Sequence, residues 1–317
     1  MTSDMTYDVV VVGGGPAGLS GAVALGRALR SVLVIDSSTP RNAPAEGVHN
    51  YLTRDGSPPA ELAALGRDEV RRFGGEIVDG EVVAVSGAAP AFEVTCADGS
   101  VVTARRLLVT TGVRDELPDV PGLRERWGRT VLHCPYCHGY EVRGRAIGVV
   151  ATTPMAMHAA LLWTQWTPDL TLFLNDTLDP DHDQQRQLAA RGVTVVPGAV
   201  TAVDDAGVHV AGGPPVPREF LVVQTRLTPR GELLASLGLE PVEHPMGIGT
   251  RIPAEDPSGR TPVPGVWVAG NVTDPMAQVI TSAAAGLTAG AAINMDLVTA
   301  ETEQAVAGRQ TPVPSSR

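Results

Sequence analysis

The sequence has few basic residues and few cysteines. Its 317 residues contain 24 lysines and arginines together against 35 aspartates and glutamates, which gives a formal net charge of -11. A protein that binds nucleic acid needs a basic stripe along the phosphates, and none is visible, so we expect no nucleic-acid partner. Because only three cysteines are present, the chain has no framework of structural disulfides.

The sequence also lacks a long aliphatic run. The N-terminal stretch Met1–Asp8 has no basic region followed by an apolar one, so we expect no secretory signal. Pro275–Asn294 carries little charge, but it is built from Ala, Gly, Thr and Ser, and this predicts a buried helix rather than a membrane span. We therefore expect a cytoplasmic protein with no membrane partner.

Hydrophobic patterning predicts a βαβ unit at the start of the chain. Tyr7–Val12 is a continuous apolar run typical of a buried parallel strand, Pro16–Leu29 has helical spacing, and Ser31–Asp36 predicts a second strand. A helix over Ser57–Phe73 and an antiparallel meander over Glu81–Val109 follow. The chain is long enough to continue into a second α/β domain.

The turn after the first strand fits the dinucleotide-binding pattern G-x-G-x-x-G. Gly13, Gly15 and Gly18 allow a tight turn, the approach of a pyrophosphate to bare backbone, and close packing of helix on strand. Asp36 ends the second strand at the spacing of an acid that holds the adenosine ribose hydroxyls. This loop fits FAD or NAD. The late segment Val266–Asn271 favours FAD, because it would bring a polar residue to the ribityl chain.

A second βαβ unit is predicted after a Pro/Gly linker at Pro118–Gly122. Its strands are Ala146–Val150 and Leu170–Leu174, with a helix near Met155–Trp166. The second nucleotide loop is missing, since only Gly148 remains and it lies within the strand. Side chains stand where a pyrophosphate would need bare backbone, and an acidic cluster follows the next strand where NADPH would need arginines. The side chains in the turn belong to Ala151, Thr153 and Met155. The acidic cluster consists of Asp176, Asp179, Asp181 and Asp183.

We therefore expect the second domain to keep the nucleotide-domain fold while binding NADPH poorly. The alternative is an unusual loop that still binds the nucleotide.

Cys134-Pro135-Tyr136-Cys137-His138 predicts a redox-active pair. Two cysteines three positions apart can form a small-ring disulfide, and His138 or a helix N-terminus could lower a thiol pKa or move protons. Zinc needs about four ligands and no second CxxC exists, so we expect no metal. A c-type haem shares the C-x-x-C-H pattern but normally follows export, and plain structural thiols are a further alternative. Cys96 lies in the meander and is expected to be a core residue.

Together these residues resemble the low-molecular-weight thioredoxin reductase family over nearly the full chain. The resemblance implies an α/β fold of two Rossmann-like three-layer domains and a homodimer. It places an FAD-binding domain at 1–118 and 246–317, discontinuous around an inserted module at 119–245 that resembles an NADPH domain and carries the CxxC. The matching segments are 11–18, 110–112, 134–137 and Ala-Gly-Asn with Gln278-Val279.

Departures from that family point to one sub-branch. The ordinary reductases have an acid where this chain has His138, Gly-Asp where it has Gly270-Asn271, and an intact NADPH loop. Together with Pro40–Pro44 and His49–Leu52, these features resemble the flavin-dependent dithiol oxidases of disulfide natural-product pathways, such as those of holomycin and gliotoxin. In those enzymes small dithiols become cyclic disulfides and oxygen takes the electrons, yielding hydrogen peroxide.

The resemblance also implies the roles of individual residues. Cys137 would lie beside the flavin and form the thiolate–flavin contact, Cys134 would be the interchange thiol that meets the substrate, and His138 would handle protons. The implied FAD contacts are Gly13, Gly15, Pro16, Ala17, Asp36, Ser37, Arg41, Asn50, Val83, Thr111, Gly112, Asn271, Gln278 and Val279.

We predict an FAD-dependent dithiol oxidase whose partners are a small-molecule dithiol and oxygen. One alternative is a reductase of thioredoxin or a related disulfide that receives electrons from NADPH or ferredoxin. A second alternative is a flavin-binding redox sensor whose CxxC reports oxidation without turnover.

Overall fold

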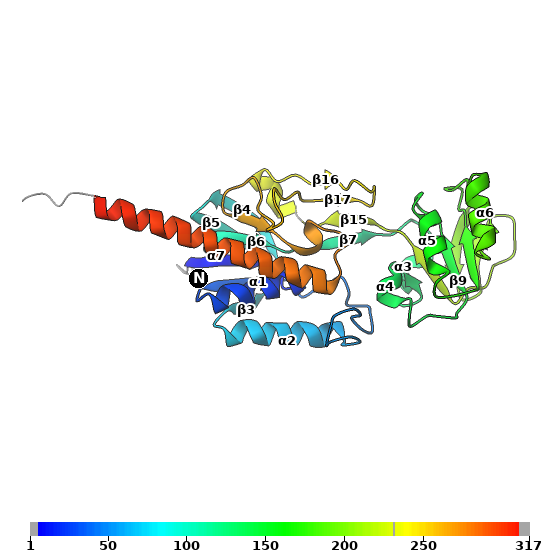
Figure 1. The fold of residues 1–317 in the computed structure, drawn as a ribbon, viewed down its shortest axis with the longest axis horizontal. Helices are drawn as coiled ribbons and strands as arrows, with labels where there is room; N and C mark the ends of the chain where they lie inside the picture. The colour runs from blue at the N-terminus through cyan, green and yellow to red at the C-terminus, as the bar shows by residue number, and fades with distance from the viewer. Residues whose placement is uncertain (1–5, 231, 311–317) are drawn as a thin grey trace, which may run out of the picture.

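The computed structural model describes residues 6–230 and 232–310 and contains two α/β domains (Figure 1). The larger domain holds both ends of the described chain, and the smaller domain is inserted into it. The long C-terminal helix α7 (Val279–Gln310) runs along the larger domain. The prediction of two Rossmann-like domains, the first discontinuous in sequence, is confirmed.

The larger domain is built on a seven-stranded sheet in the order β3-β2-β1-β6-β5-β4, with β18 also paired to β6. The predicted first βαβ unit and the meander both belong to this sheet. The strands β1, β2, β3, β6 and β18 run parallel, whereas β5 is paired antiparallel to both β4 and β6. Its strands are β1 (Thr6–Val12), β2 (Val32–Asp36), β3 (Glu76–Asp79), β4 (Val82–Ala88), β5 (Ala91–Cys96), β6 (Val101–Val109) and β18 (Val266–Val268).

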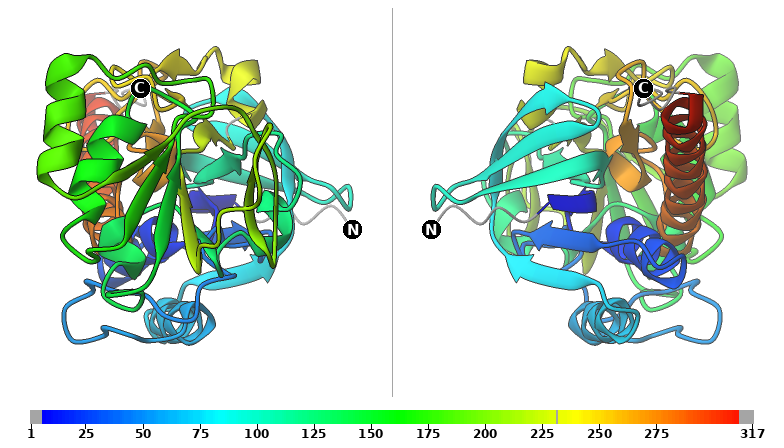
Figure 2. Two further views of the ribbon diagram at one scale, coloured as in Figure 1. Left: turned by 90° about the vertical axis from the view of Figure 1, so that its right-hand side faces the viewer. Right: turned by 90° about the vertical axis from the view of Figure 1, so that its left-hand side faces the viewer.

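Two helices pack closely on one face of this sheet because glycines remove the side chains between them. A Cβ on Gly286 of α7 would lie 1.9 Å from the carbonyl oxygen of Ala17 in α1 (Pro16–Arg27), and one on Gly290 would lie 2.8 Å from that of Gly21. Figure 2 shows α7 end-on beside α1. The helix α2 (Pro59–Arg72) lies beyond α1, close to the predicted Ser57–Phe73.

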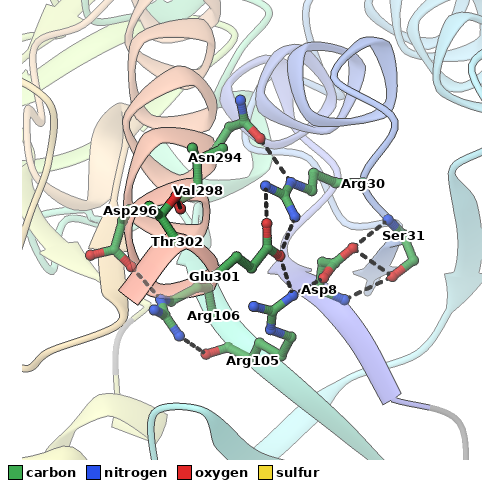
Figure 3. A network of polar contacts seen from close by, with 10 residues as sticks. All are labelled: Asp8, Arg30, Ser31, Arg105, Arg106, Asn294, Asp296, Val298, Glu301 and Thr302. Carbon is green, nitrogen blue, oxygen red and sulfur yellow. Dashed lines mark hydrogen bonds and ion pairs between the residues drawn. The ribbon is translucent and has the colours of Figure 1, made fainter. Parts of the chain in front are cut away.

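An ion-pair network fastens the distal half of α7 to the sheet (Figure 3). Glu301 lies 2.6 Å from Arg30 and 2.7 Å from Arg105, and Arg106 pairs with Asp296. These contacts join α7 to β6 and to the loop after α1. The two arginines lower the pKa of Glu301 to about 2 by hydrogen bonding to its carboxylate.

Among the described residues, the α7 segment Val279–Arg309 is the one helix long and apolar enough to cross a membrane by length and composition. Ala289, Ile293 and Leu297 on this helix are fully buried in the core of the domain. The prediction of a buried helix is therefore right for one face. The other face exposes apolar side chains, among them Leu287.

The smaller domain has a five-stranded parallel sheet in the order β11-β10-β9-β14-β8. The predicted second βαβ unit forms its centre as β9, α5 and β10. A hairpin and three further helices complete the domain. Its elements are α3 (Leu123–Arg126), β8 (Val131–Leu132), α4 (Pro135–His138), β9 (Ile147–Val150), α5 (Ala156–Trp163), β10 (Leu170–Phe173), α6 (His182–Ala190), β11 (Thr194–Val196), β12 (Val200–Asp204), β13 (Gly207–Val210) and β14 (Phe220–Val223).

Two antiparallel strands, β7 (Val113–Glu116) and β15 (Arg226–Pro229), connect the domains. After β15 the chain re-enters the core of the larger domain, where Leu239 and Ile252 are buried. The chain therefore returns to the larger domain before residue 246, the predicted boundary. The segment between β15 and residue 246 already packs on the meander strands. Its elements are the 3-10 helix η1 (Glu232–Leu237), β16 (Val242–Glu243), β17 (Thr250–Arg251) and, after β18, the 3-10 helix η2 (Gly270–Val272).

Candidate active site

The glycine-rich loop has the geometry of a phosphate cradle. A Cβ on Gly18 would lie 1.9 Å from the carbonyl oxygen of Gly13, and one on Gly13 would lie 2.6 Å from that of Thr110. These glycines let helix α1 and strand β6 close around the turn. Around Gly15 a Cβ would meet nothing within 4 Å, so bare backbone faces open space at the helix N-terminus. A helix N-terminus favours an anionic ligand through its free N–H groups and its dipole.

Asp36 stands at the end of β2, as predicted, and is engaged on both sides. Its Oδ1 accepts a hydrogen bond from Gly14 N at 3.0 Å, and its Oδ2 lies 3.3 Å from a guanidinium nitrogen of Arg67. Arg67 also pairs with Asp79 at 2.6 Å. Arg67 cannot be identified from the sequence, because it occupies an ordinary polar position on α2 and only the fold brings it to the nucleotide loop.

The cysteine pair lies on a single turn of helix. Cys134 is the N-cap residue of α4, and both cysteines are free thiols. The Cys137 thiol donates a hydrogen bond to the Cys134 sulfur, and the backbone N–H groups of Cys137 and Tyr136 add to it, which lowers the pKa of Cys134 to about 7. The same donation and burial raise the pKa of Cys137. In the reduced pair, ionisation therefore favours Cys134 over Cys137.

Arg41 adds positive charge near both sulfurs, which adds to the fall in the pKa of Cys134 and opposes the rise in the pKa of Cys137. Its guanidinium forms a bidentate pair with Asp115 of β7 at 2.6 and 2.7 Å, and Thr225 donates to the same carboxylate at 2.8 Å. The Arg41 side chain therefore joins a loop of the larger domain to both connecting segments. Its predicted contact with FAD remains a prediction.

His138 is the last residue of α4, which we call the redox helix (Pro135–His138), and is largely buried. Burial lowers the pKa of its imidazole, and within residues 6–230 and 232–310 neither ring nitrogen has a hydrogen-bond partner. A neutral, unpartnered imidazole beside two thiols can accept a proton released from sulfur. Burial also lowers the pKa of His133, on the other side of the pair.

A single cavity of about 2080 Å³ brings the predicted site residues together. It runs from the glycine-rich loop to the cysteine pair and on to the smaller domain at Met155 and His158. Asn50 is not among the lining residues. The predicted site residues that line the cavity are Gly13, Gly15, Pro16, Ala17, Asp36, Ser37, Arg41, Val83, Thr111, Gly112, Cys134, Cys137, His138, Asn271, Gln278 and Val279.

Two predicted cofactor contacts have protein partners of their own. The side-chain amide of Asn50 donates to the carbonyl oxygen of Tyr136 at 2.5 Å. The amide nitrogen of Asn271 donates to the carbonyl oxygens of Asp274, Pro275 and Ala277 at 3.1, 3.2 and 2.8 Å. A ligand contact by Asn271 therefore falls to its amide oxygen.

The residues of the cavity fit FAD. The open backbone at Gly15 would receive the pyrophosphate. Asp36, at the end of β2, would hold the hydroxyls of the adenosine ribose. Among the described residues, the buried Oγ1 of Thr111 has no hydrogen-bond partner, so a polar ligand atom can meet it beside the loop. From there the cavity continues to Cys137, which is where the ring system of a flavin would reach the thiols.

The corresponding turn of the smaller domain, after β9, carries side chains where the first loop has glycines. A Cβ on Gly148 would lie 2.8 Å from Leu221 and from Phe173, so this glycine serves packing inside the strand. Asn175, with a left-handed φ of 52°, donates to the carbonyl oxygen of Ala151 at 2.9 Å and accepts from Val200 N at 2.8 Å. The turn is thus tied to its neighbours through side chains rather than opened by glycines.

Comparison with known proteins identifies the family. The family model of the pyridine nucleotide-disulphide oxidoreductases matches residues 7–290. The chain belongs to this family. It is 30% identical over 322 aligned positions to the thioredoxin reductase sirT of Leptosphaeria maculans. The alignment covers 95% of this chain and 97% of the relative.

Solved structures support the same assignment. The crystal structure of HlmI superimposes on this structure with a TM-score of 0.89, and the two sequences are 44% identical. The match covers 97% of this chain and 98% of that chain. An oxidoreductase from Agrobacterium tumefaciens also has a TM-score of 0.89, at 38% identity, covering 93% of this chain and 99% of that chain. The predicted resemblance to thioredoxin reductases is confirmed, and the protein is an oxidoreductase of flavoprotein type.

Proposed function

We propose that the protein is an FAD-dependent dithiol oxidase that converts a small-molecule dithiol into an intramolecular disulfide. One observation carries the proposal: the cysteine pair shares a cavity with the glycine-rich loop, whereas the turn after β9, which would have to hold a nicotinamide nucleotide, has no glycine from Ala151 to Met155. The substrate class follows from the resemblance to dithiol oxidases of disulfide natural-product pathways.

The oxidised pair reacts with the substrate by thiol–disulfide exchange. A substrate thiolate attacks the Cys134 sulfur, the Cys134–Cys137 bond breaks, and a mixed disulfide forms while Cys137 leaves as the thiolate. The second substrate thiol, once deprotonated, attacks the first substrate sulfur and releases the cyclic disulfide with Cys134 as the leaving thiolate. The substrate has then lost two electrons and two protons to the pair and its surroundings.

The chain's own residues favour the second step. A thiol of low pKa leaves faster, so the lowered pKa of Cys134 helps to release the product. His138 accepts a proton from the attacking thiol because burial keeps its imidazole neutral. When bound, FAD would supply a two-electron acceptor for the dithiol pair that oxygen could reoxidise, with hydrogen peroxide as the product.

A second candidate is reduction of thioredoxin or a related disulfide with electrons from NADPH or ferredoxin. The naming of relatives such as sirT as thioredoxin reductases supports it. The same cysteine pair would then work in the opposite direction. The absence of a glycine-rich turn after β9 favours the oxidase.

We further propose a cytoplasmic homodimer. The reactive thiol pair suits a reducing compartment. The outer face of α7 exposes a row of apolar side chains at helical spacing, and a second copy of the same helix could cover it. These are Ile280, Leu287, Met295, Val298 and Val306, between 39% and 67% exposed. Sedimentation equilibrium of the FAD-loaded protein tests the assembly, and a monomer at micromolar concentration would contradict it.

Steady-state oxygen uptake with dithiothreitol tests the activity. We expect dithiol-dependent uptake with hydrogen peroxide formed in equal amount, abolished in Cys137→Ser and in Cys134→Ser. Cys96→Ser is the matched control, because this thiol is buried in the meander, only 7% exposed, and should leave the rate unchanged. Undiminished turnover in Cys137→Ser would contradict the mechanism.

A further inference from the structure

Asn50 makes a polar contact with the redox helix from the opposite domain. It follows β2 in the larger domain, and its side-chain amide donates at 2.5 Å to the carbonyl oxygen of Tyr136, the residue just before Cys137. In this four-residue helix the N–H of Gly139 bonds to Pro135 O and that of Cys137 bonds to Cys134 O. Asn50 supplies a donor to the carbonyl of Tyr136, which lies between the two cysteines in sequence.

The segment that carries Asn50 is closed upon itself. We name residues 48–57 the docking loop. Val48 N donates to Ser57 O and Gly56 N to Val48 O, both at 2.8 Å, and Asp55 Oδ1 accepts from Asn50 N at 2.8 Å. Asn50 has a left-handed φ of 60°, a conformation that asparagine tolerates better than most residues. The loop therefore presents the Asn50 amide in a fixed direction.

The docking loop has a second contact with the segment that follows the redox helix. His49 Nδ1 lies 3.3 Å from Asp55 Oδ2, and its Nε2 lies 3.6 Å from Glu141 Oε1. His49 is thus held by the loop on one side and faces the smaller domain on the other. Two neighbouring residues of the larger domain therefore contact the two ends of the stretch from Tyr136 to Glu141.

The segment before the docking loop fastens the two domains at two more points. Arg41 binds Asp115, which also accepts from Thr225 in the second connecting segment. Pro44 lies so close to Gly128 that a Cβ there would be 2.6 Å from the proline ring. These contacts oppose a rotation of the smaller domain that would carry the cysteine pair away from the cavity.

We propose that Asn50 is a positioning residue that holds the cysteine pair over the flavin end of the cavity, with the docking loop as its support. Asn50 does not line that cavity, so it acts through the helix rather than on the substrate or the cofactor. This inference rests on the proposed transfer of electrons from the pair to the flavin.

Anaerobic stopped-flow reduction of the FAD-loaded protein by dithiothreitol tests the inference. In Asn50→Ala the limiting rate of flavin bleaching should fall by about fivefold to tenfold, the range expected for one lost hydrogen bond. The dithiothreitol concentration at half-maximal rate should change little, since Asn50 does not meet the dithiol. Reoxidation of the reduced flavin by oxygen should keep its rate, which a general loss of structure would not allow.

Two further variants sharpen the result. Asn50→Asp keeps the size of the side chain but turns an acceptor toward the Tyr136 carbonyl, so its limiting rate should be no higher than that of Asn50→Ala. Leu52→Ala is the matched control in the same loop, because Leu52 is 79% exposed and outside the cavity lining, and its rate should equal that of the wild type.

The outcomes separate this inference from the proposed function. Wild-type bleaching by dithiothreitol together with wild-type rates in both Asn50 variants would overturn the positioning role alone. If dithiothreitol does not bleach the wild-type flavin, the dithiol oxidase proposal fails first, and the positioning role fails with it.

Discussion

The reduced cysteine pair should react asymmetrically, and the pH at which it does so is predictable. The Cys134 thiol, with a pKa lowered to about 7, is half ionised at neutral pH. An ordinary thiol with a pKa of about 8.5 is only about 3% ionised at pH 7. The perturbation to apply is therefore a brief exposure to an alkylating reagent across a range of pH.

The expected gain in the alkylation rate of Cys134 over an ordinary thiol is smaller than the gain in its ionised fraction. Ionisation favours Cys134 by about sixteenfold at pH 7 over an ordinary thiol. A thiolate of lower pKa is a weaker nucleophile, and a Brønsted slope of about 0.45 over about 1.5 pKa units removes about fivefold. The net advantage at pH 7 is about threefold. The pH of the inflection is a sharper signature, because it depends only on ionisation.

The assay uses the FAD-loaded protein, reduced anaerobically with dithiothreitol, desalted and pulsed with iodoacetamide from pH 5 to pH 10. Peptide mass spectrometry at low conversion gives the rate at each cysteine. Cys134 labelling should rise with an inflection near pH 7, and Cys137 should lag because its proton is held by its partner. The buried Cys96 is an internal control and should stay unlabelled. Preferential labelling of Cys137, or an inflection for Cys134 above pH 8, would refute the assignment.

Two other predictions concern the frame of the site. Asn271→Asp should weaken FAD retention at pH 7, because a carboxylate cannot donate to the three carbonyl oxygens that Asn271 now contacts. Ultrafiltration of the FAD-loaded protein measures the retention. Unchanged retention would show that those contacts do not contribute to FAD binding. Glu301→Gln should lower the free energy of urea unfolding by about 1 kcal/mol at pH 7, a value discounted for solvent exposure. Because the folded pKa of Glu301 is lowered from 4.5 to about 2, this difference is fully present above pH 4.5 and shrinks as the pH falls toward 2. Glu303→Gln on the exposed face is the matched control, and an equal loss in both variants would remove the special role of Glu301.

The local parts of the fold and site could be predicted from the sequence. The first βαβ unit and its glycines depend on neighbouring residues, since a tight turn and a following helix are encoded within one short stretch. Asp36 was found by its spacing from that loop, and the structure places it against Gly14. The cysteine pair was recognised from its own spacing. Its shared cavity with the loop was implied by the resemblance, because no local pattern links residues 13 and 134.

The parts that sequence reasoning missed depend on contacts between distant segments. The connecting strands β7 and β15 are short and carry charged residues, so neither has the alternation of a half-buried strand. The roles of Asp115 and Arg67 cannot be predicted from the sequence, because nothing near them in sequence indicates a partner. Asn50 was assigned to the cofactor by resemblance, and the structure adds a contact with the redox helix that lies 86 positions away.

Whether thiols or a nicotinamide supply the electrons is the central question. Anaerobic addition of NADPH to the FAD-loaded protein, followed by dithiothreitol in the same cuvette, answers it through the flavin absorbance. The account predicts no bleaching with NADPH and prompt bleaching with dithiothreitol. Prompt bleaching by NADPH would demonstrate a working nicotinamide site in the smaller domain and contradict the account.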